Sequence, residues 1–417
     1  MPTPRKIALL CLLLAGATSA QAGPSLSLPQ ALAAAFANNP ELAAAGQQIG
    51  IADGERRQAG LIPNPELAWE REDTRRDTST TTVTLSQPLE LGGKRGTRIA
   101  VASAGQAIAQ LDLERQRNGL RADVVQAFHA ALRAQTAVAL AQQSQALTER
   151  GLRVAQGRVA AGQSSPLEAT RAQVQLAQAV AAVRRAQTQR SVANQALARL
   201  TGSPQASFGQ LQAANLSPGA APSADALLDQ VEQTVEWRLA AAQVERGDAS
   251  LGAEKALRIP NLTVSLGSQY SREDRERVNV VGLSMPLPLF DRNQGNVLAA
   301  ARRADQARDL RNAVALRLRS ETRNAVSQWA TAMQDVQAYD RTILPAAQQA
   351  VDTATRGFEM GKFAFLDVLD AQRTLIDARG LYLEALALAS DARAQVERIY
   401  GDLDDFSKFP HSRSNND

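Results

Sequence analysis

Two aspartates stand at a spacing that lets their carboxylates act together. Asp367 and Asp370 follow a glycine-containing turn and lie at the start of a helical segment. Because residues three apart on a helix share a face, the two carboxylates are expected to lie side by side. Two interpretations remain open: the pair forms a charged site that attracts cations, or the acids only complement the positive end of the helix dipole.

The other residue types that carry chemistry are scarce and scattered. His129 and His411 are the two histidines, and neither has a second histidine or an acidic cluster at a metal-ligand spacing. No Ser/His/Asp set, phosphate-binding loop or paired-carboxylate pocket is visible in the sequence. We therefore expect no enzymatic activity, no cofactor and no metal site, and we assign both histidines structural or solvated roles.

The charge balance and the N-terminal segment narrow the class of protein further. The chain has 46 Lys and Arg against 42 Asp and Glu, without a basic patch interleaved with aromatic residues, so we expect no nucleic-acid partner. Residues 1–22 combine two basic residues, an apolar run and an A-x-A site, which predicts a cleaved secretory signal. Cys11 lies inside that run in a context that does not suit acylation, so we expect no lipid anchor. No later run is long and apolar enough for a transmembrane helix.

The chain resembles itself at an offset of about 200 residues, which predicts an internal repeat. The segment 162–168 aligns with 361–367, and 61–64 aligns with 258–261. A stretch rich in Pro, Ala, Gly and Ser separates the two copies. The expected organisation is therefore a first unit at 23–202, a linker at 203–223, a second unit at 224–401 and a polar C-terminal tail at 402–417.

Each unit shows the same order of elements: a helix, a β-hairpin, a long helix, a turn and a return helix. The expected fold class is therefore mainly α with a small β part. The first helices are expected at 28–59 and 224–257, each followed by a Pro-Asn signal. The later elements, given for the first and then the second unit, are hairpins at about 64–91 and 259–288, long helices at about 96–157 and 295–356, and return helices at about 166–200 and 365–399.

The helices carry the spacing of coiled coils, with apolar residues seven apart. Most of their remaining surface is polar, so each helix covers only a narrow seam. Such rods are expected to associate with others, because one seam cannot hold a monomer together. The series that predict the seams are Leu140, Leu147 and Val154; Leu167, Val174 and Ala181; and Val368, Leu375, Tyr382, Ala389 and Val396.

The hairpins alternate apolar and polar residues and end in strongly charged turns, as in Leu262, Val264 and Leu266. Two hairpins supply four strands, whereas the smallest transmembrane barrel has about eight, so one chain cannot close a barrel alone. Two, three or four copies all remain arithmetically possible. Trp69 and Tyr270 on the strands are candidates for the lipid interface, whereas Trp237 and Trp329 in the helices are expected to pack.

The chain resembles the TolC-type outer-membrane efflux channels over essentially its whole mature length. The segments 87–95 and 287–295 further resemble the heavy-metal branch of that family, most closely the cobalt-zinc-cadmium resistance channels. The resemblance implies a homotrimer, with a 12-stranded β-barrel in the outer membrane that continues into a 12-helix coiled-coil α-barrel across the periplasm. It also implies a periplasmic adaptor protein and a proton-driven inner-membrane pump of the resistance-nodulation-division class.

The resemblance assigns roles to both turns. Asp367 and Asp370 match the carboxylates of the periplasmic aperture, although Glu168 in the first unit also supports the helix-dipole interpretation for Asp367. Asp370 has Arg171 as its counterpart, and the family's basic residue four positions before the first acid is replaced by Phe363, which puts the salt-bridge latch in doubt. The expected adaptor contacts are the tip residues Gly162, Gln163, Ser164, Gly361, Lys362 and Phe363.

The favoured function is therefore the outer-membrane channel of a tripartite system that exports heavy-metal cations such as cobalt, zinc and cadmium. A duct for organic drugs is the alternative within the same class, because a passive passage does not encode its substrate. A periplasmic coiled-coil adaptor is the alternative from another class. Extraction with the outer membrane in detergent favours the channel, whereas release in osmotic shock fluid favours the adaptor.

Overall fold

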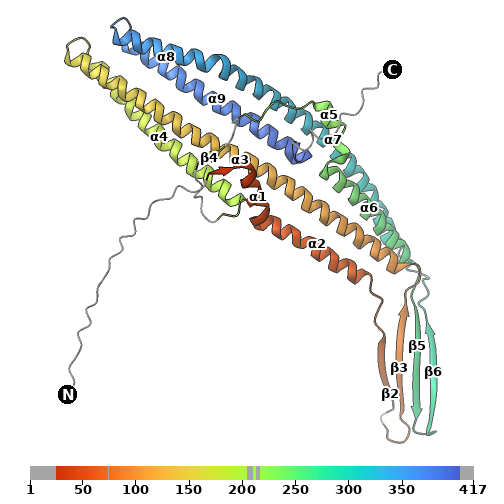
Figure 1. Cartoon of the computed structure of the whole chain (residues 1–417). Coiled ribbons are helices and arrows are strands. Elements are labelled where there is room, and N and C mark those ends of the chain that lie inside the picture. The colour runs from red at the N-terminus through yellow and green to blue at the C-terminus, as the bar shows by residue number, and fades with distance from the viewer. Residues whose placement is uncertain (1–24, 74, 204–209, 213–216, 404–417) are drawn as a thin grey trace, which may run out of the picture.

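The structure, a computed structural model, is an elongated helical body with a narrow β-sheet at one end (Figure 1). It describes residues 25–73, 75–203, 210–212 and 217–403. The expected signal segment at 1–22, Cys11, His411 and nearly all of the C-terminal tail lie outside these residues. A mainly helical fold with a small sheet part is confirmed. Within the described residues, none of the helices combines the length and apolar character needed to cross a membrane.

The first half of the chain contains helices α1 to α4 and strands β2 and β3. The helix expected at 28–59 is divided, because Asn39 leaves the helical conformation and Pro40 begins a new helix. The Asn39 side chain accepts hydrogen bonds from the amides of Glu41 and Leu42 and therefore caps the second piece. The elements are α1 (Leu28–Asn38), α2 (Pro40–Ala59), β2 (Glu66–Glu72), β3 (Thr80–Leu89), α3 (Lys94–Ala160) and α4 (Pro166–Leu200).

The second half follows the same order, with two more interruptions. The first helical segment contains a short helix and a 3-10 turn before its main helix, and the long helix is broken by a π-helical turn just before Pro345. Pro345 has no N–H and cannot donate a helical hydrogen bond. The corresponding helix of the first half, α3, runs without a break. The elements are α5 (Ala224–Leu228), η1 (Val231–Gln233), α6 (Val235–Ala256), β5 (Leu262–Ser271), β6 (Glu276–Ser284), α7 (Gln294–Ala338), η2 (Tyr339–Ile343), α8 (Leu344–Glu359) and α9 (Phe365–Tyr400).

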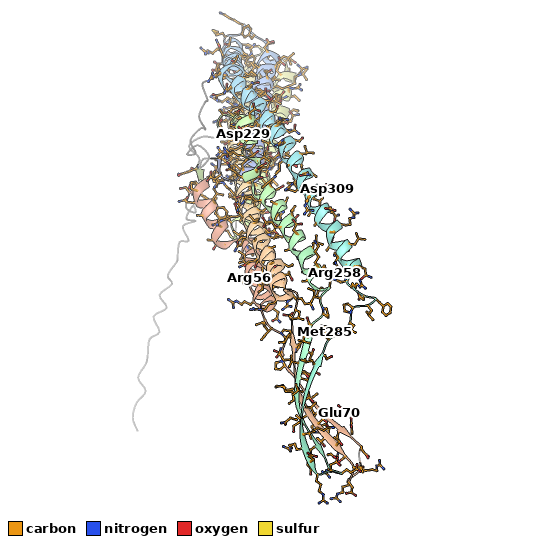
Figure 2. All side chains as sticks on the ribbon, turned by 90° about the vertical axis from the view of Figure 1, so that its right-hand side faces the viewer. Arg56, Glu70, Asp229, Arg258, Met285 and Asp309 are labelled. Atoms are coloured by element: carbon orange, nitrogen blue, oxygen red, sulfur yellow. The ribbon has the colours of Figure 1, made fainter. Side chains whose placement is uncertain are left out.

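The two hairpins join into one four-stranded antiparallel sheet with the order β2-β3-β5-β6. Leu85 pairs with Leu67 on one side and with Leu266 on the other, which fixes the register. The hairpin turns lie at the end of the sheet far from the helices (Figure 1). Figure 2 shows Glu70 on the sheet, and Arg258 and Met285 where the sheet meets the helices.

The seam of α4 differs from the predicted one. Leu167 and Val174 are 53% and 52% exposed, so the heptad series that begins at Leu167 does not face the partner helix. The buried face of α4 instead carries Ala172, Ala179 and Ala186, which are also seven apart. Small side chains let α3 and α4 approach closely. The series on α9 faces its neighbours as predicted, since Val368, Leu375, Ala389 and Val396 are buried.

A second small sheet was not predicted. Strand β1 (Leu26–Ser27) pairs in parallel with β4 (Leu211–Gln212), and β4 lies inside the segment 203–223 that was expected to be a linker. Leu211 is buried in a cluster with α1, α3 and α4. Gly219, in the same segment, accepts a hydrogen bond from Trp329 Nε1 at 3.1 Å. The described parts of this segment are therefore packed against the helices.

Candidate functional site

Two tight turns lie at the helical end of the molecule opposite the sheet, between α3 and α4 and between α8 and α9 (Figure 1). Gly162 and Gly361 both have positive φ angles, 70° and 73°, which a side chain would strain. The amide of Gln163 donates to the carbonyl of Arg158 at 2.8 Å, and the amide of Lys362 donates to that of Gly357 at 2.8 Å. The two turns therefore end their helices with the same hydrogen-bond pattern.

Arg158 joins the two turns, a role that the sequence analysis missed. Its Nη1 donates to the Phe358 carbonyl at 2.9 Å, and its Nε donates to Ser164 Oγ at 3.1 Å. Its guanidinium also lies over the Phe358 ring, 4.7 Å from the centroid. The only local signal was a basic residue in the last turn of a helix, which is common, so spacing alone could not identify it.

A cluster of buried apolar side chains lies next to these turns. Phe358 and Phe365 have ring centroids 5.3 Å apart, and both side chains are buried with Val368. Phe363 is 44% exposed and lies against Gly357, where an added Cβ would come within 2.1 Å of the ring. Phe363 therefore covers the end of α8.

The two aspartates occupy neighbouring exposed positions at the start of α9. Asp367 Oδ2 accepts a hydrogen bond from the amide of Ala364 at 2.9 Å, so this carboxylate caps the helix as the dipole interpretation expects. Asp370 lies one turn further along and makes no such cap. Both residues line one groove of about 990 Å³ between α9 and the α3–α4 pair, so they share a face as predicted.

The same groove contains cations as well as the two carboxylates. Arg185 from α4 and Arg373 and Arg379 from α9 line it. Arg379 Nη2 donates to Gln348 Oε1 at 3.2 Å, and burial lowers the pKa of its guanidinium. In one chain the groove is therefore mixed in charge and is not a purely acidic site.

The four-stranded sheet has two chemically different faces. The apolar face carries Trp69, which is 66% exposed, and the cross-strand row of Leu67, Leu85, Leu266 and Val281. The opposite face carries Glu66, Glu70 and Glu72 of β2 and mainly Thr, Ser and Gly of the other strands. The sheet of the single chain therefore exposes one apolar and one polar face.

The middle of the helical body contains buried titratable groups. His129 is 8% exposed, and burial with the nearby Arg133 and Arg393 lowers its pKa to about 4. Glu397 is fully buried, and burial raises its pKa, although Arg393 Nε donates to it at 2.8 Å. Arg121 approaches the same carboxylate at 3.8 Å from α3. The approach of Arg121 to Glu397 joins α3 to α9, and His129 is buried in the same helical body.

The two tryptophans of the helices pack as expected. Trp329 is buried, and Trp237 packs partly buried against the same cluster, whereas Trp69 projects from the sheet. Tyr270 is 38% exposed on the same sheet face as Trp69. In the described part of the chain, no three His, Cys, Asp or Glu side chains gather in a way that could hold a metal ion.

The chain is similar in sequence and in fold to known proteins. The family model for "Outer membrane efflux protein" matches residues 31–203 and 232–402. The cobalt-zinc-cadmium resistance protein CzcC of Cupriavidus metallidurans is 40% identical over 91% of each chain. The nickel-cobalt-cadmium resistance protein NccC of Alcaligenes xylosoxydans xylosoxydans is 29% identical over 77% of this chain and 74% of its own. The solved structure of the channel CusC shares the fold at 18% identity, with a TM-score of 0.76 over 90% of this chain and 92% of its own.

Proposed function

Because this chain belongs to the outer membrane efflux protein family, we propose that it is the outer-membrane channel of a tripartite system that exports heavy-metal cations such as cobalt, zinc and cadmium. The observation that carries the proposal is the 40% identity to a cobalt-zinc-cadmium resistance protein across 91% of both chains. The chain is a transport conduit and not an enzyme. It supplies a wet passage, and the choice of metal belongs to the pump.

Three copies of the chain form the channel. One chain supplies four strands and leaves the outer edges of β2 and β6 unpaired, and an open edge cannot be satisfied in lipid. A homotrimer closes a 12-stranded β-barrel that continues into a 12-helix α-barrel, each chain adding the same repeated unit twice. The exposed Val174 of α4 and Leu316 of α7 support this association, because they form apolar surface that a single chain leaves uncovered.

The ends of the molecule take different partners. The sheet lies in outer-membrane lipid, and the helical body crosses the periplasm after export by the signal at 1–22 without a lipid anchor. The tip turns at 161–165 and 360–364 contact the periplasmic adaptor protein, which links the channel to a proton-driven pump of the resistance-nodulation-division class. The matching geometry of the two turns supports this assignment, because it presents two equivalent ends to one repeated partner surface.

Asp367 and Asp370 form the cation-selective aperture. Six carboxylates from three chains favour cations near the axis, and the lack of a capping bond at Asp370 leaves that carboxylate available. Asp367→Asn with Asp370→Asn is expected to reduce the preference for cations in planar bilayers. Asp309→Asn, a change at an exposed aspartate of α7 that does not line this groove, is the control. Unchanged reversal potentials in the double variant would remove the aperture assignment.

Metal toxicity after deletion tests the function as a whole. With adaptor and pump left in place, loss of this chain is expected to sensitise cells to cobalt, zinc or cadmium salts, and re-expression is expected to restore growth. Sensitivity to organic drugs with unchanged metal tolerance would favour the drug duct. Recovery of the chain in osmotic shock fluid would favour the periplasmic adaptor.

A further inference from the structure

One row of residues crosses all four strands on the apolar face, near the end of the sheet far from the helices. Arg71 pairs with Thr81, Thr81 with Tyr270, and Tyr270 with Arg277. The register therefore places two arginines and a tyrosine in one row on the face that carries Trp69, with Tyr270 next to Arg277 and with Thr81 between Arg71 and Tyr270. Arg71 and Arg277 lie on the two edge strands of the sheet.

The row lies where the apolar band ends. Along β3, the stretch from Leu89 to Thr81 is about 27 Å at 3.4 Å per residue, and a strand tilt of about 40° reduces its height to about 21 Å, within a few ångström of the roughly 25 Å apolar band of a membrane barrel. Beyond the row each strand has one more residue, and the charged hairpin turns follow. Tyrosine is typical of this boundary, because its ring is apolar and its hydroxyl is wet.

The charges separate by face at this end of the sheet. Glu70, Glu72 and Glu276 lie on the opposite, polar face, because they alternate with Arg71 and Arg277 along their strands. Within the described residues, no salt bridge engages either arginine; Arg71 Nη2 donates to Ser79 Oγ at 3.1 Å. The apolar face thus ends in positive charge that carboxylates of the same chain do not neutralise.

We propose that Arg71, Tyr270 and Arg277 bind the phosphate groups of the phosphorylated glycolipid in the outer leaflet of the outer membrane. Guanidinium groups bind phosphate through paired, charge-assisted hydrogen bonds, and the apolar rows below them accept the acyl chains. The inference rests on the proposed trimeric barrel, in which the β6 edge of one subunit meets the β2 edge of the next. Arg277 and the neighbouring subunit's Arg71 then lie on adjacent strands, and a shared phosphate relieves their repulsion.

Native mass spectrometry of the purified trimer with added lipid A tests this site. Arg71→Gln with Arg277→Gln is expected to lower bound lipid A by roughly tenfold or more, and Arg71→Lys with Arg277→Lys is expected to retain part of it. Glu70→Gln with Glu72→Gln, on the polar face of the same sheet, is the matched control and is expected to bind as wild type does. Dephosphorylated lipid A has the same acyl chains. It is expected to bind to wild type no better than phosphorylated lipid A binds to the Gln double variant.

Specific results overturn the proposal. Equal binding of lipid A by the Gln double variant and wild type would do so, as would equal binding of phosphorylated and dephosphorylated lipid by wild type. Heat-modifiable migration of each variant confirms that the trimer has formed before binding is compared. If the wild-type chain is soluble and monomeric without detergent, the proposed trimeric barrel is wrong. A trimer that forms but binds no lipid A contradicts only the lipid site.

Discussion

Single side chains decide how the helical tips are held. Arg158 bonds to both turns and covers the Phe358 ring, whereas Phe363 covers the end of α8. One carboxylate oxygen of Asp367 caps the start of α9, whereas Asp370 makes no such cap. The tip is therefore stabilised mainly by an arginine of α3 within one chain.

Replacing Arg158 by alanine is expected to loosen both turns. The change removes two hydrogen bonds and the contact with the ring, which together contribute about 1–3 kcal/mol. Amide hydrogen exchange in 161–165 and 360–364 should therefore become roughly 5- to 150-fold faster. Arg153→Ala, an exposed position on the same helix, should leave exchange unchanged. Equal exchange in both variants would show that Arg158 does not join the turns.

His129 predicts a pH dependence of stability. Its pKa in the folded chain is about 4 against an ordinary value of 6.5, so the unfolded chain binds a proton between these values while the folded chain does not. The stabilisation is complete above pH 6.5 and is lost as the pH falls toward 4. Between pH 7 and 5 the free energy of unfolding should drop by about 2 kcal/mol on this account.

Urea unfolding in detergent, compared between wild type and His129→Gln, measures this contribution. The variant cannot take up the proton, so its stability should fall less over the same pH interval. The burial of the imidazole next to Arg133 and Arg393 is the physical cause. Identical pH profiles for the two proteins would contradict the assignment.

Short breaks set the directions of the longer elements. Asn39 is 5% exposed, and besides capping α2 its Nδ2 donates to the Leu200 carbonyl at 3.1 Å, which ties the α1–α2 junction to the end of α4. Gly202 is needed beside it, because an added Cβ would come within 2.5 Å of the Asn38 carbonyl oxygen. The π-helical turn η2 interrupts only the second long helix. The two units therefore share an order of elements without having identical rods.

Asn39→Ala is expected to destabilise this junction. Loss of the cap costs about 1–2 kcal/mol, and the buried Leu200 carbonyl loses its donor as well. Thermal unfolding followed by circular dichroism should show a lower midpoint than wild type. Gln48→Ala, an exposed change on α2, is the control and should leave the midpoint in place. A midpoint equal to that of the control would refute the junction's role.

The molecule as a whole is incomplete as a single chain. Its sheet has two open edges and an apolar face, and its helices expose Val174 and Leu316 at 52% and 70%. Open strand edges and exposed apolar helix residues of this kind are stabilised when other chains pair with them or cover them. The stability of this chain is therefore expected to depend on assembly.

Val174→Glu is expected to weaken the trimer. A carboxylate placed in an apolar seam between subunits must be desolvated without a partner, which costs several kcal/mol. Detergent-solubilised protein should shift from trimer to monomer in size-exclusion chromatography with light scattering. Gln173→Glu adds the same charge one position away on the same helix, where it is exposed, and should remain trimeric. A trimer in both variants would show that this face of α4 is not an interface.

The sequence by itself determined the local features of this protein. Hydrophobic period and glycine turns indicated the helices, the hairpins and the tips, because these depend on residues close together in the chain. The offset of about 200 residues indicated that the same elements occur twice. The tertiary structure decided which distant segments meet. The pairing of β3 with β5, the alanine seam of α4 in place of Leu167 and Val174, the docking of the segment around Leu211 and the joining of the tips by Arg158 all depend on contacts between segments far apart. Local spacing leaves several faces and partners equally suitable, and only packing in three dimensions selects among them.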